Sequence, residues 1–182
     1  MEAPCALRIR AAAVDDVAAV ARIYDEIHAA EEAGAMTTGW LRGVYPTAAT
    51  AEAAQRRGDL FVLEEDGVIR GAAVLNQLQV DVYAGAPWEH DAPDAQVCVL
   101  HTLVISPGAA RRGLGRRFVR FYEDYARALG CRELRMDTNA RNARARAMYA
   151  ALGYREIGVV PTVFNGIPGV QLVLLEKHLS TE

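Results

Sequence analysis

Residues 97–118, VCVLHTLVISPGAARRGLGRRF, constrain the fold of this chain more than any other stretch. They begin with an almost unbroken apolar run that ends at Ser106, and such a run is typical of a strand buried on both faces. Gly113 and Gly115 follow, and from Leu114 onward apolar residues recur every three or four positions, as on the buried side of a helix. The segment therefore predicts a strand, a short loop and a helix that begins near Gly113.

The predicted helix start has the properties of an anion-binding site. The first backbone amides of a helix together carry roughly half a positive charge, and glycines there let a phosphate approach the backbone closely. An arginine keeps its charge and can bind phosphate oxygens through two parallel hydrogen bonds. Four arginines surround this point: Arg111, Arg112, Arg116 and Arg117. We therefore expect a diphosphate or a ribose phosphate here, with a solvated basic first turn as the alternative.

Two other phosphate-binding loops fit less well. A dinucleotide fingerprint requires a third glycine where this chain has Phe118, although Asp137 lies about where the ribose-binding acid is expected. A P-loop requires Gly-Lys followed by Ser or Thr, and the only lysine of the chain is Lys177. The first interpretation is weak and the second is excluded.

Residues 110–115, ARRGLG, resemble the acetyl-CoA loop of the GNAT N-acetyltransferase superfamily, which has Gln or Arg, two residues, Gly, one residue, and Gly or Ala. Ala110 departs from this pattern at its first position. A second motif of the superfamily, Asn-x-x-Ala-x-x-x-Tyr-x-x-x-Gly-aromatic, is matched by Asn142, Ala145, Tyr149, Gly153 and Tyr154. Because two independent motifs occur in the expected order, the chain is identified as resembling this superfamily.

The resemblance implies a set of residues that bind acetyl-CoA as co-substrate, and it implies no metal. The helix start and its arginines would bind the pyrophosphate, and backbone groups at the end of the preceding strand would bind the pantetheine arm. Asn142 would contact the same arm, while Asn139 would cap the following helix. The complete set is Leu103, Val104, Ile105, Arg111, Arg112, Gly113, Leu114, Gly115, Arg116 and Asn142.

Acetyl transfer to an amine requires a base and an acid. A primary amine with a pKa near ~10 is almost wholly protonated at pH 7, and the departing thiolate needs a nearby proton donor. The resemblance implies that Tyr149 is this donor; a buried core tyrosine is the alternative. Some branches of the superfamily place a water-relaying histidine at the position of His101, and a near-neutral pKa suits a base. His101 is expected on the strand face shared with Val97, Val99, Leu103 and Ile105. A hydrogen-bonded core histidine fits the sequence equally well.

The acceptor side is less constrained by sequence. Trp40, Tyr45, Tyr83 and Trp88 lie in segments expected to flank the cofactor cleft, and residues 164–169 would form another wall. Four acids add negative charge to the predicted 80–95 loop: Asp81, Glu89, Asp91 and Asp94. This composition favours a cationic or aromatic amine, and an ordinary hydrophilic surface loop is the alternative.

Composition restricts the partners. A formal net charge of −3 gives no overall attraction to nucleic acid or anionic membranes. The three cysteines lack paired or metal-ligand spacing, and no apolar run approaches the ~20 residues that span a bilayer. We expect no export signal, because the N-terminal residues lack a basic segment followed by a continuous apolar core. We expect a cytoplasmic protein that uses no metal, nucleic acid or membrane, and a homodimer is left open.

The chain, 182 residues long and 52% hydrophobic, can bury one substantial core, and no linker is evident. We therefore predict a single GNAT domain over residues 1–182. Helices are expected near 15–27, 47–58, 113–129 and 139–152. Strands are expected at 7–10, 60–63, 68–79, 96–105, 133–137, 154–160 and 170–178. This order predicts an α/β fold, and the resemblance implies the GNAT acyl-CoA N-acyltransferase fold, a mixed, mostly antiparallel sheet of six or seven strands with helices on both faces.

The predicted function is an acetyl-CoA-dependent N-acetyltransferase in which a primary amine of a small molecule, amino acid or peptide attacks the thioester directly. Ala110 and the uncertain base leave one alternative open, a catalytically weak acyl-CoA-binding or regulatory module of the same fold. A further alternative, an RNA-associated domain, rests on Arg141, Arg144 and Arg146. No RNA-binding aromatic motif accompanies these arginines.

Overall fold

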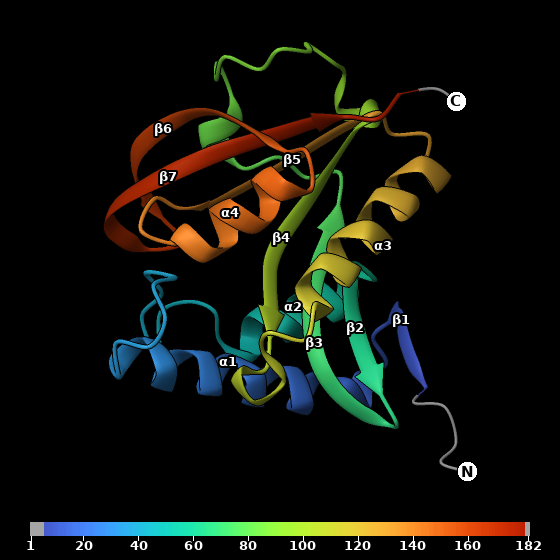
Figure 1. Cartoon of the computed structure of the whole chain (residues 1–182), viewed down its shortest axis with the longest axis vertical. Helices are drawn as coiled ribbons and strands as arrows, with labels where there is room; N and C mark the ends of the chain where they lie inside the picture. Colours follow the sequence, from blue (N-terminus) through green and yellow to red (C-terminus); the bar gives the residue numbers. More distant parts are fainter. Residues whose placement is uncertain (1–5, 181–182) are drawn as a thin grey trace.

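The computed structural model describes residues 6–180 and arranges them as seven strands in one sheet with four α-helices (Figure 1). The helices are α1 (Val17–Glu32), α2 (Ala48–Arg57), α3 (Leu114–Ala128) and α4 (Ala143–Ala151). The strands are β1 (Leu7–Ala11), β2 (Leu60–Glu65), β3 (Val68–Asn76), β4 (Val97–Ile105), β5 (Glu133–Asn139), β6 (Arg155–Phe164) and β7 (Ile167–His178). This confirms the predicted order of helices and strands.

The strand order in the sheet is β1-β2-β3-β4-β5-β7-β6. Only β4 and β5 pair in parallel, and the other neighbours are antiparallel. The connection between the parallel pair contains α3, as a parallel crossover requires. The prediction of a mixed, mostly antiparallel sheet is confirmed.

The sheet opens between β4 and β5. Their parallel pairing runs from Val97↔Glu133 to Leu100↔Met136 and then stops. Beyond that point β4 continues beside β3 as far as Ile105, while β5 continues beside β7 as far as Asn139. Figure 1 shows β4 leaving β5 in this way, with α4 over the β5–β7 half. The two halves of the sheet therefore form a V-shaped opening at the C-terminal end of β4.

A bulge in β4 changes which residues share a face. The pairs Ala72↔Val104 and Val74↔His101 leave one extra residue on β4, and Thr102 has a φ of 51°, in the left-handed region that a bulge uses. After the bulge, Leu103 and Ile105 pack on the side of α3, while Val104 packs on the side of α1. The expectation that His101 shares a face with Leu103 and Ile105 is therefore wrong.

The sheet is buried on both faces. One face packs against α3 and α4 through a cluster that includes Phe118 and Leu134, and the other packs against α1 and α2 through Val20 and Ile27. In β2, Phe61 and Leu63 face α3 while Leu60 and Val62 face α1. Burial on both faces explains the continuous apolar runs in the sequence, and helices on both faces were predicted.

One local expectation, that Asn139 caps the helix after β5, differs from the structure. The N-cap of α4 is Asn142, whose Oδ1 accepts a hydrogen bond from the Ala145 amide at 3.2 Å. Asn139, expected as the cap, is the last residue of β5, and its Oδ1 accepts from the Arg141 amide. Both asparagines make the local side-chain bond that favours them before helices, so sequence alone did not show which of them is the N-cap.

None of the helices within residues 6–180 is long and apolar enough to cross a membrane.

Candidate active site

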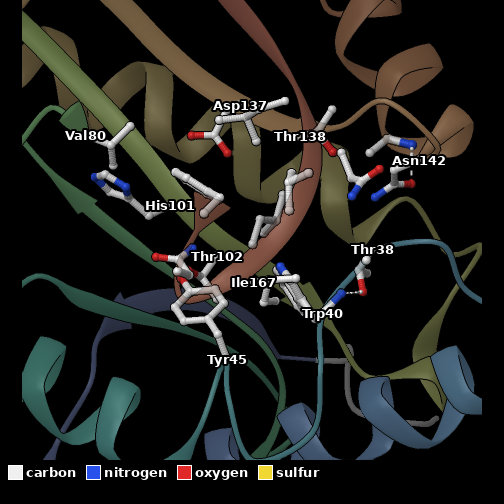
Figure 2. A pocket seen from close by; sticks show the side chains of 18 of the residues that line it. Thr38, Trp40, Tyr45, Val80, His101, Thr102, Asp137, Thr138, Asn142 and Ile167 are labelled. Carbon is white, nitrogen blue, oxygen red and sulfur yellow. Dashed lines mark hydrogen bonds between the residues drawn. The ribbon is translucent and has the colours of Figure 1, made fainter. Parts of the chain in front are cut away.

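A cavity of about 140 Å³ lies where β4 separates from β5. Figure 2 shows Asp137 and Thr138 of β5 across this cavity from Trp40 and Tyr45 of the loop after α1. The other lining residues come from the loop before β4, β4 itself, the end of β5, α4 with its N-cap, and the hairpin of β6 and β7. They include Val80, His101, Thr102, Leu103, Asn139, Asn142, Tyr149, Phe164, Asn165 and Ile167. Segments distant in sequence thus meet at the opening of the sheet.

Asp137 is the only acidic residue that lines the cavity within the described chain. It follows the buried Met136 on β5, and its Oδ2 accepts a hydrogen bond of 2.7 Å from the Tyr83 hydroxyl. Burial raises the pKa of Asp137 from 3.8 to about 6, although the bond from Tyr83 lowers it. The carboxylate can therefore exchange a proton close to neutral pH.

Tyr149 reaches the same cavity from α4 and is 5% exposed. Its hydroxyl has no hydrogen-bond partner among residues 6–180, unlike those of Tyr83 and Tyr122. Burial, followed by the nearby charge of Asp137, raises the pKa of Tyr149 above its usual value of 10. The hydroxyl consequently keeps its proton at neutral pH and is available as a donor inside the cavity.

His101 lines the cavity as a neutral imidazole. Its Nε2 lies 2.9 Å from Asn76 Oδ1, and the Asn76 amide is oriented because its Nδ2 donates to Asp59 Oδ2 at 2.8 Å. The network therefore assigns the proton of the neutral ring to Nε2 and the lone pair to Nδ1. Burial lowers the pKa of His101 from 6.5 to about 4, so protonating this ring costs more than protonating Asp137.

The glycine loop leads directly into α3, which begins at Leu114 as the sequence predicts. Its N-cap is Gly113, whose φ of 76° favours glycine. No side chain caps the helix, and its first turn has no acid. A Cβ on Gly115 would lie 3.2 Å from Met148 Sδ, so this glycine also permits close packing of α3 against α4. The amides at this helix start can bind an anion.

The arginines around the helix start differ in their surroundings. Arg111 and Arg116 are exposed, and Arg111 has a φ of 63°. Arg112 is bound to Glu65 of β2, with 2.9 Å between Nη1 and Oε2. The side chain of Glu65 is 8% exposed and also pairs with Arg70. Arg111 and Arg116 are therefore better placed than Arg112 to neutralise a bound phosphate.

Comparison with known proteins settles the family. Residues 19–154 match the family model "Acetyltransferase (GNAT) family". The chain belongs to this family. The chain is 37% identical over 67 residues to the mycothiol acetyltransferase of Beutenbergia cavernae, which covers 37% of this chain and 23% of that protein. It is 30% identical over 74 residues to the aminoglycoside N(6')-acetyltransferase type 1 of Klebsiella aerogenes, which covers 41% of this chain and 49% of that protein. These matches span less than half of either relative.

Solved structures share the fold of this GNAT-family chain over nearly its full length. A GNAT-family acetyltransferase of Streptococcus agalactiae superposes with a TM-score of 0.77 at 23% identity, covering 96% of both chains. The yncA protein of Salmonella typhimurium, solved with its cofactor acetyl-CoA, superposes with a TM-score of 0.68 at 23% identity and covers 97% of this chain and 96% of that one. The GNAT fold predicted from sequence is thus confirmed.

The strand end predicted to bind the pantetheine arm borders the cavity. From His101 to Ile105, the edge of β4 that faces β5 has no strand partner within the described residues, so its backbone groups can bind a ligand. Leu103 lines the cavity, whereas Val104 is 2% exposed and packs on the α1 side. Asn142 also lines the cavity, but its Oδ1 caps α4, which leaves its Nδ2 as the group able to contact a ligand.

The acceptor side only partly matches the sequence expectation. Trp40 and Tyr45 line the cavity with their ring centroids 5.9 Å apart, and Phe164 lines it from β6. Tyr83 contributes indirectly through Asp137, whereas Trp88 lies under the Arg135 guanidinium at 4.2 Å. None of the four acids of the 80–95 loop lines the cavity.

Asp137 is the functional candidate that sequence reasoning missed. The sequence suggests a role for it only as the ribose-binding acid of a dinucleotide fold. The signal in the sequence was an acid directly after Leu134-Arg135-Met136, near the end of a predicted strand that follows the buried 96–105 strand.

Proposed function

We propose that this GNAT acetyltransferase transfers an acetyl group from acetyl-CoA to a primary amine of a small cationic or aromatic molecule bound in the cavity. One observation carries the proposal: a single cavity at the opening of the sheet is lined by both Asp137 and Tyr149. Asp137 can take up a proton from the amine before it attacks the thioester, and Tyr149 can give a proton to the sulfur that leaves. The family membership supports acetyl-CoA as the donor.

The placement of acetyl-CoA follows from the groups that the fold leaves available. The amides of Leu114, Gly115 and Arg116 would bind the pyrophosphate, and the exposed guanidinium groups of Arg111 and Arg116 would neutralise its charge. The unpaired edge of β4 at residues 103–105 would bind the pantetheine arm. This path runs along β4 from the helix start to the cavity, so the thioester would meet Asp137 and Tyr149.

In the proposed reaction, the Asp137 carboxylate removes a proton from the bound ammonium group. The freed nitrogen lone pair attacks the thioester carbonyl carbon, forming the C–N bond as the C–S bond breaks. Tyr149 gives its proton to the leaving sulfur and is reprotonated by the proton that the acetylated nitrogen then loses, while Asp137 releases the first proton to solvent. Charge and protons therefore balance without an acyl-enzyme intermediate.

Asp137 is favoured over His101 as the base. An amine has a pKa near ~10, so transfer to a carboxylate of pKa about 6 is uphill by about 5 kcal/mol. Transfer to an imidazole of pKa about 4 is uphill by about 8 kcal/mol. His101, predicted from sequence as the base, remains the alternative, since its Nδ1 lone pair is compatible with a water relay.

Titration calorimetry with acetyl-CoA and CoA, followed by a thiol-release screen against amines, amino acids and peptides, tests this function. We expect micromolar binding and release with at least one small amine. Binding without release on any acceptor would favour the regulatory module, and absence of binding would refute the cofactor assignment.

A further inference from the structure

A second cluster of reactive side chains lies away from the cavity, at the other end of β5. His90, Glu133 and His178 each offer one possible ligand atom, and within residues 6–180 these atoms lie within 4.8 Å of one another. His178 Nδ1 is 2.6 Å from Glu133 Oε1, and the two imidazole centroids are 4.6 Å apart. The three residues come from the loop before β4, the start of β5 and the end of β7.

We propose that this cluster binds a divalent transition metal of the zinc class. Two imidazoles and a carboxylate form a ligand set that zinc accepts, with bonds of about 2.0–2.2 Å and ligand atoms therefore about 3.4 Å apart in a tetrahedron. The Glu133–His178 contact would open by less than about 1 Å, and the ligand atom of His90 would close by at most about 1.4 Å. The metal would take the place of the proton between Glu133 and His178 Nδ1, which on a neutral imidazole moves to Nε2.

The cluster combines a buried charge with an open side. Glu133 is 6% exposed, and the only side chain of residues 6–180 that hydrogen-bonds it is His178. His90 is exposed and the His178 side chain is 40% exposed. Water can therefore complete the coordination of a metal held by three protein ligands. A buried carboxylate also gains from a cation placed against it, because its own hydration has been lost.

The backbone around His90 is already fixed in place. Arg135 Nη2 donates to the His90 carbonyl oxygen at 3.0 Å, and the Glu89 amide donates to the Glu176 carboxylate at 3.0 Å. Arg135 and Glu176 are paired in register on β5 and β7, two positions along from the Glu133↔His178 pair. Binding therefore requires side-chain rotation, with little ordering of the loop, which favours affinity.

The proposed metal would fasten the 77–96 loop to the sheet. Figure 1 shows this loop at the top of the molecule, beside the end of β7. Asp137 lies four residues beyond Glu133, about 13 Å along an extended strand, so the metal site is separate from the cavity. Its expected effect is on the stability of the loop, and it does not depend on the proposed acetyl transfer.

The test is calorimetric titration of Zn²⁺ into the untagged, chelator-treated full chain. We expect one ion per chain with a dissociation constant in the micromolar range or below, and a Tm increase of about 5 °C or more at a hundredfold excess over that constant. His90→Ala should weaken binding at least about tenfold, as is common when a metal site loses part of its ligand sphere. Asp91→Asn, which removes an exposed acid beside His90, is the matched control and should change affinity less than about twofold.

His90 is exposed on a loop, so its alanine variant is expected to fold, which circular dichroism can verify. His178→Ala and Glu133→Gln should reproduce its loss of affinity. Saturable binding that persists unchanged in His90→Ala, or that disappears in Cys131→Ser, would place the metal elsewhere and overturn the proposal. Absence of saturable binding at 100-fold molar excess of zinc would overturn it as well.

Discussion

The cavity and a nearby polar cluster contain similar side chains in different states of pairing. In the cluster, Glu123 of α3 accepts hydrogen bonds from Tyr154 at 3.2 Å and from Lys177 at 2.8 Å. In the cavity, Asp137 accepts one hydrogen bond, from Tyr83, while the Tyr149 hydroxyl has no partner within the described chain. Both regions have a carboxylate and a tyrosine, but only the first has a cation bound to its carboxylate.

This difference separates a stabilising network from a reactive one. Lys177 also donates to the Leu152 carbonyl oxygen at 2.8 Å, so the Glu123 cluster joins α3, the end of α4 and β7. A satisfied buried network stabilises one packing arrangement. A carboxylate with few partners keeps a raised pKa and can exchange a proton, which is how catalytic groups are commonly recognised. We expect substitutions in the two regions to affect different quantities.

The largest expected effect is that of Asp137→Asn on turnover. The substitution retains the shape and an acceptor for Tyr83 but removes the base, so kcat should fall about 100-fold or more while the dissociation constant for CoA stays unchanged. In the wild type, kcat/KM should rise with pH through an apparent pKa near 6, because the base acts when deprotonated. That limb should be absent in the variant.

Glu123→Gln is the matched control and should retain turnover within about threefold. Equal losses of kcat in both variants would show that a catalytic carboxylate cannot be distinguished from a structural one by whether a cation is bound to it. If the rise of kcat/KM with pH were kept in Asp137→Asn and absent in His101→Asn, the base would be His101.

The next effect is that of Tyr149→Phe, which should lower kcat about 10- to 100-fold with KM for acetyl-CoA nearly unchanged, since a proton donor acts in the transition state. Steady-state kinetics with the acceptor found in the thiol-release screen measures this. Tyr154→Phe, the corresponding change in the Glu123 cluster, removes a hydrogen bond at 3.2 Å and should change stability by about 1 kcal/mol. Full turnover in Tyr149→Phe at every pH would remove the acid role.

The third prediction concerns stability, where the two carboxylates should respond with opposite signs. Glu123→Gln breaks an ion pair with Lys177, which is 25% exposed, and should lower the free energy of unfolding by about 1–2 kcal/mol. Asp137→Asn should raise it by about 1–3 kcal/mol at pH 8, because burial disfavours the ionised carboxylate. Urea denaturation of both variants measures these changes.

The raised pKa of Asp137 determines whether its contribution to the free energy of unfolding rises or falls with pH. Its pKa is raised from 3.8 to about 6 on folding, so between these values the folded protein holds a proton that the unfolded chain has released. Its contribution to stability therefore falls as pH rises from about 4 through 6. Asp137→Asn should gain little at pH 4 and most at pH 8; a gain independent of pH would show that packing, and not ionisation, is responsible.

Periodicity in the sequence was sufficient to predict the order of the elements, but it did not reveal the bulge in β4. The run 97–105 is apolar on both faces, so it contains no alternation from which a change of face could be detected. The extra residue at Thr102 moved Leu103 and Ile105 to the α3 side. Local signals, Gly113 and Gly115 followed by apolar residues every three or four positions, were enough to place the start of α3 correctly.

The candidate site was predicted where it depends on a local motif and missed where it depends on long-range contacts. The second motif of the family identified Tyr149 and Asn142 as candidates, and both line the cavity. Asp137 becomes distinctive only because β4 separates from β5 and Tyr83 reaches it from another loop. The pairing of Arg112 with Glu65 likewise joins residues distant in sequence. Sequence analysis therefore could not distinguish Arg112 from Arg111 as a phosphate ligand.

The smallest expected effect tests pairing among these arginines. Arg111 has no side-chain partner within residues 6–180, and Arg111→Ala should weaken CoA binding about fivefold, which corresponds to about 1 kcal/mol for an exposed charged contact. Arg112→Ala should change CoA affinity less than about twofold, because the guanidinium already neutralises the Glu65 carboxylate, but it should lower the Tm by leaving part of that buried charge unbalanced. Calorimetric titration with CoA and thermal unfolding of each variant give both quantities. A greater loss of affinity in Arg112→Ala would mean that Arg112 exchanges Glu65 for phosphate when CoA binds, and pairing in the free protein would then be a poor guide to which charges bind the cofactor.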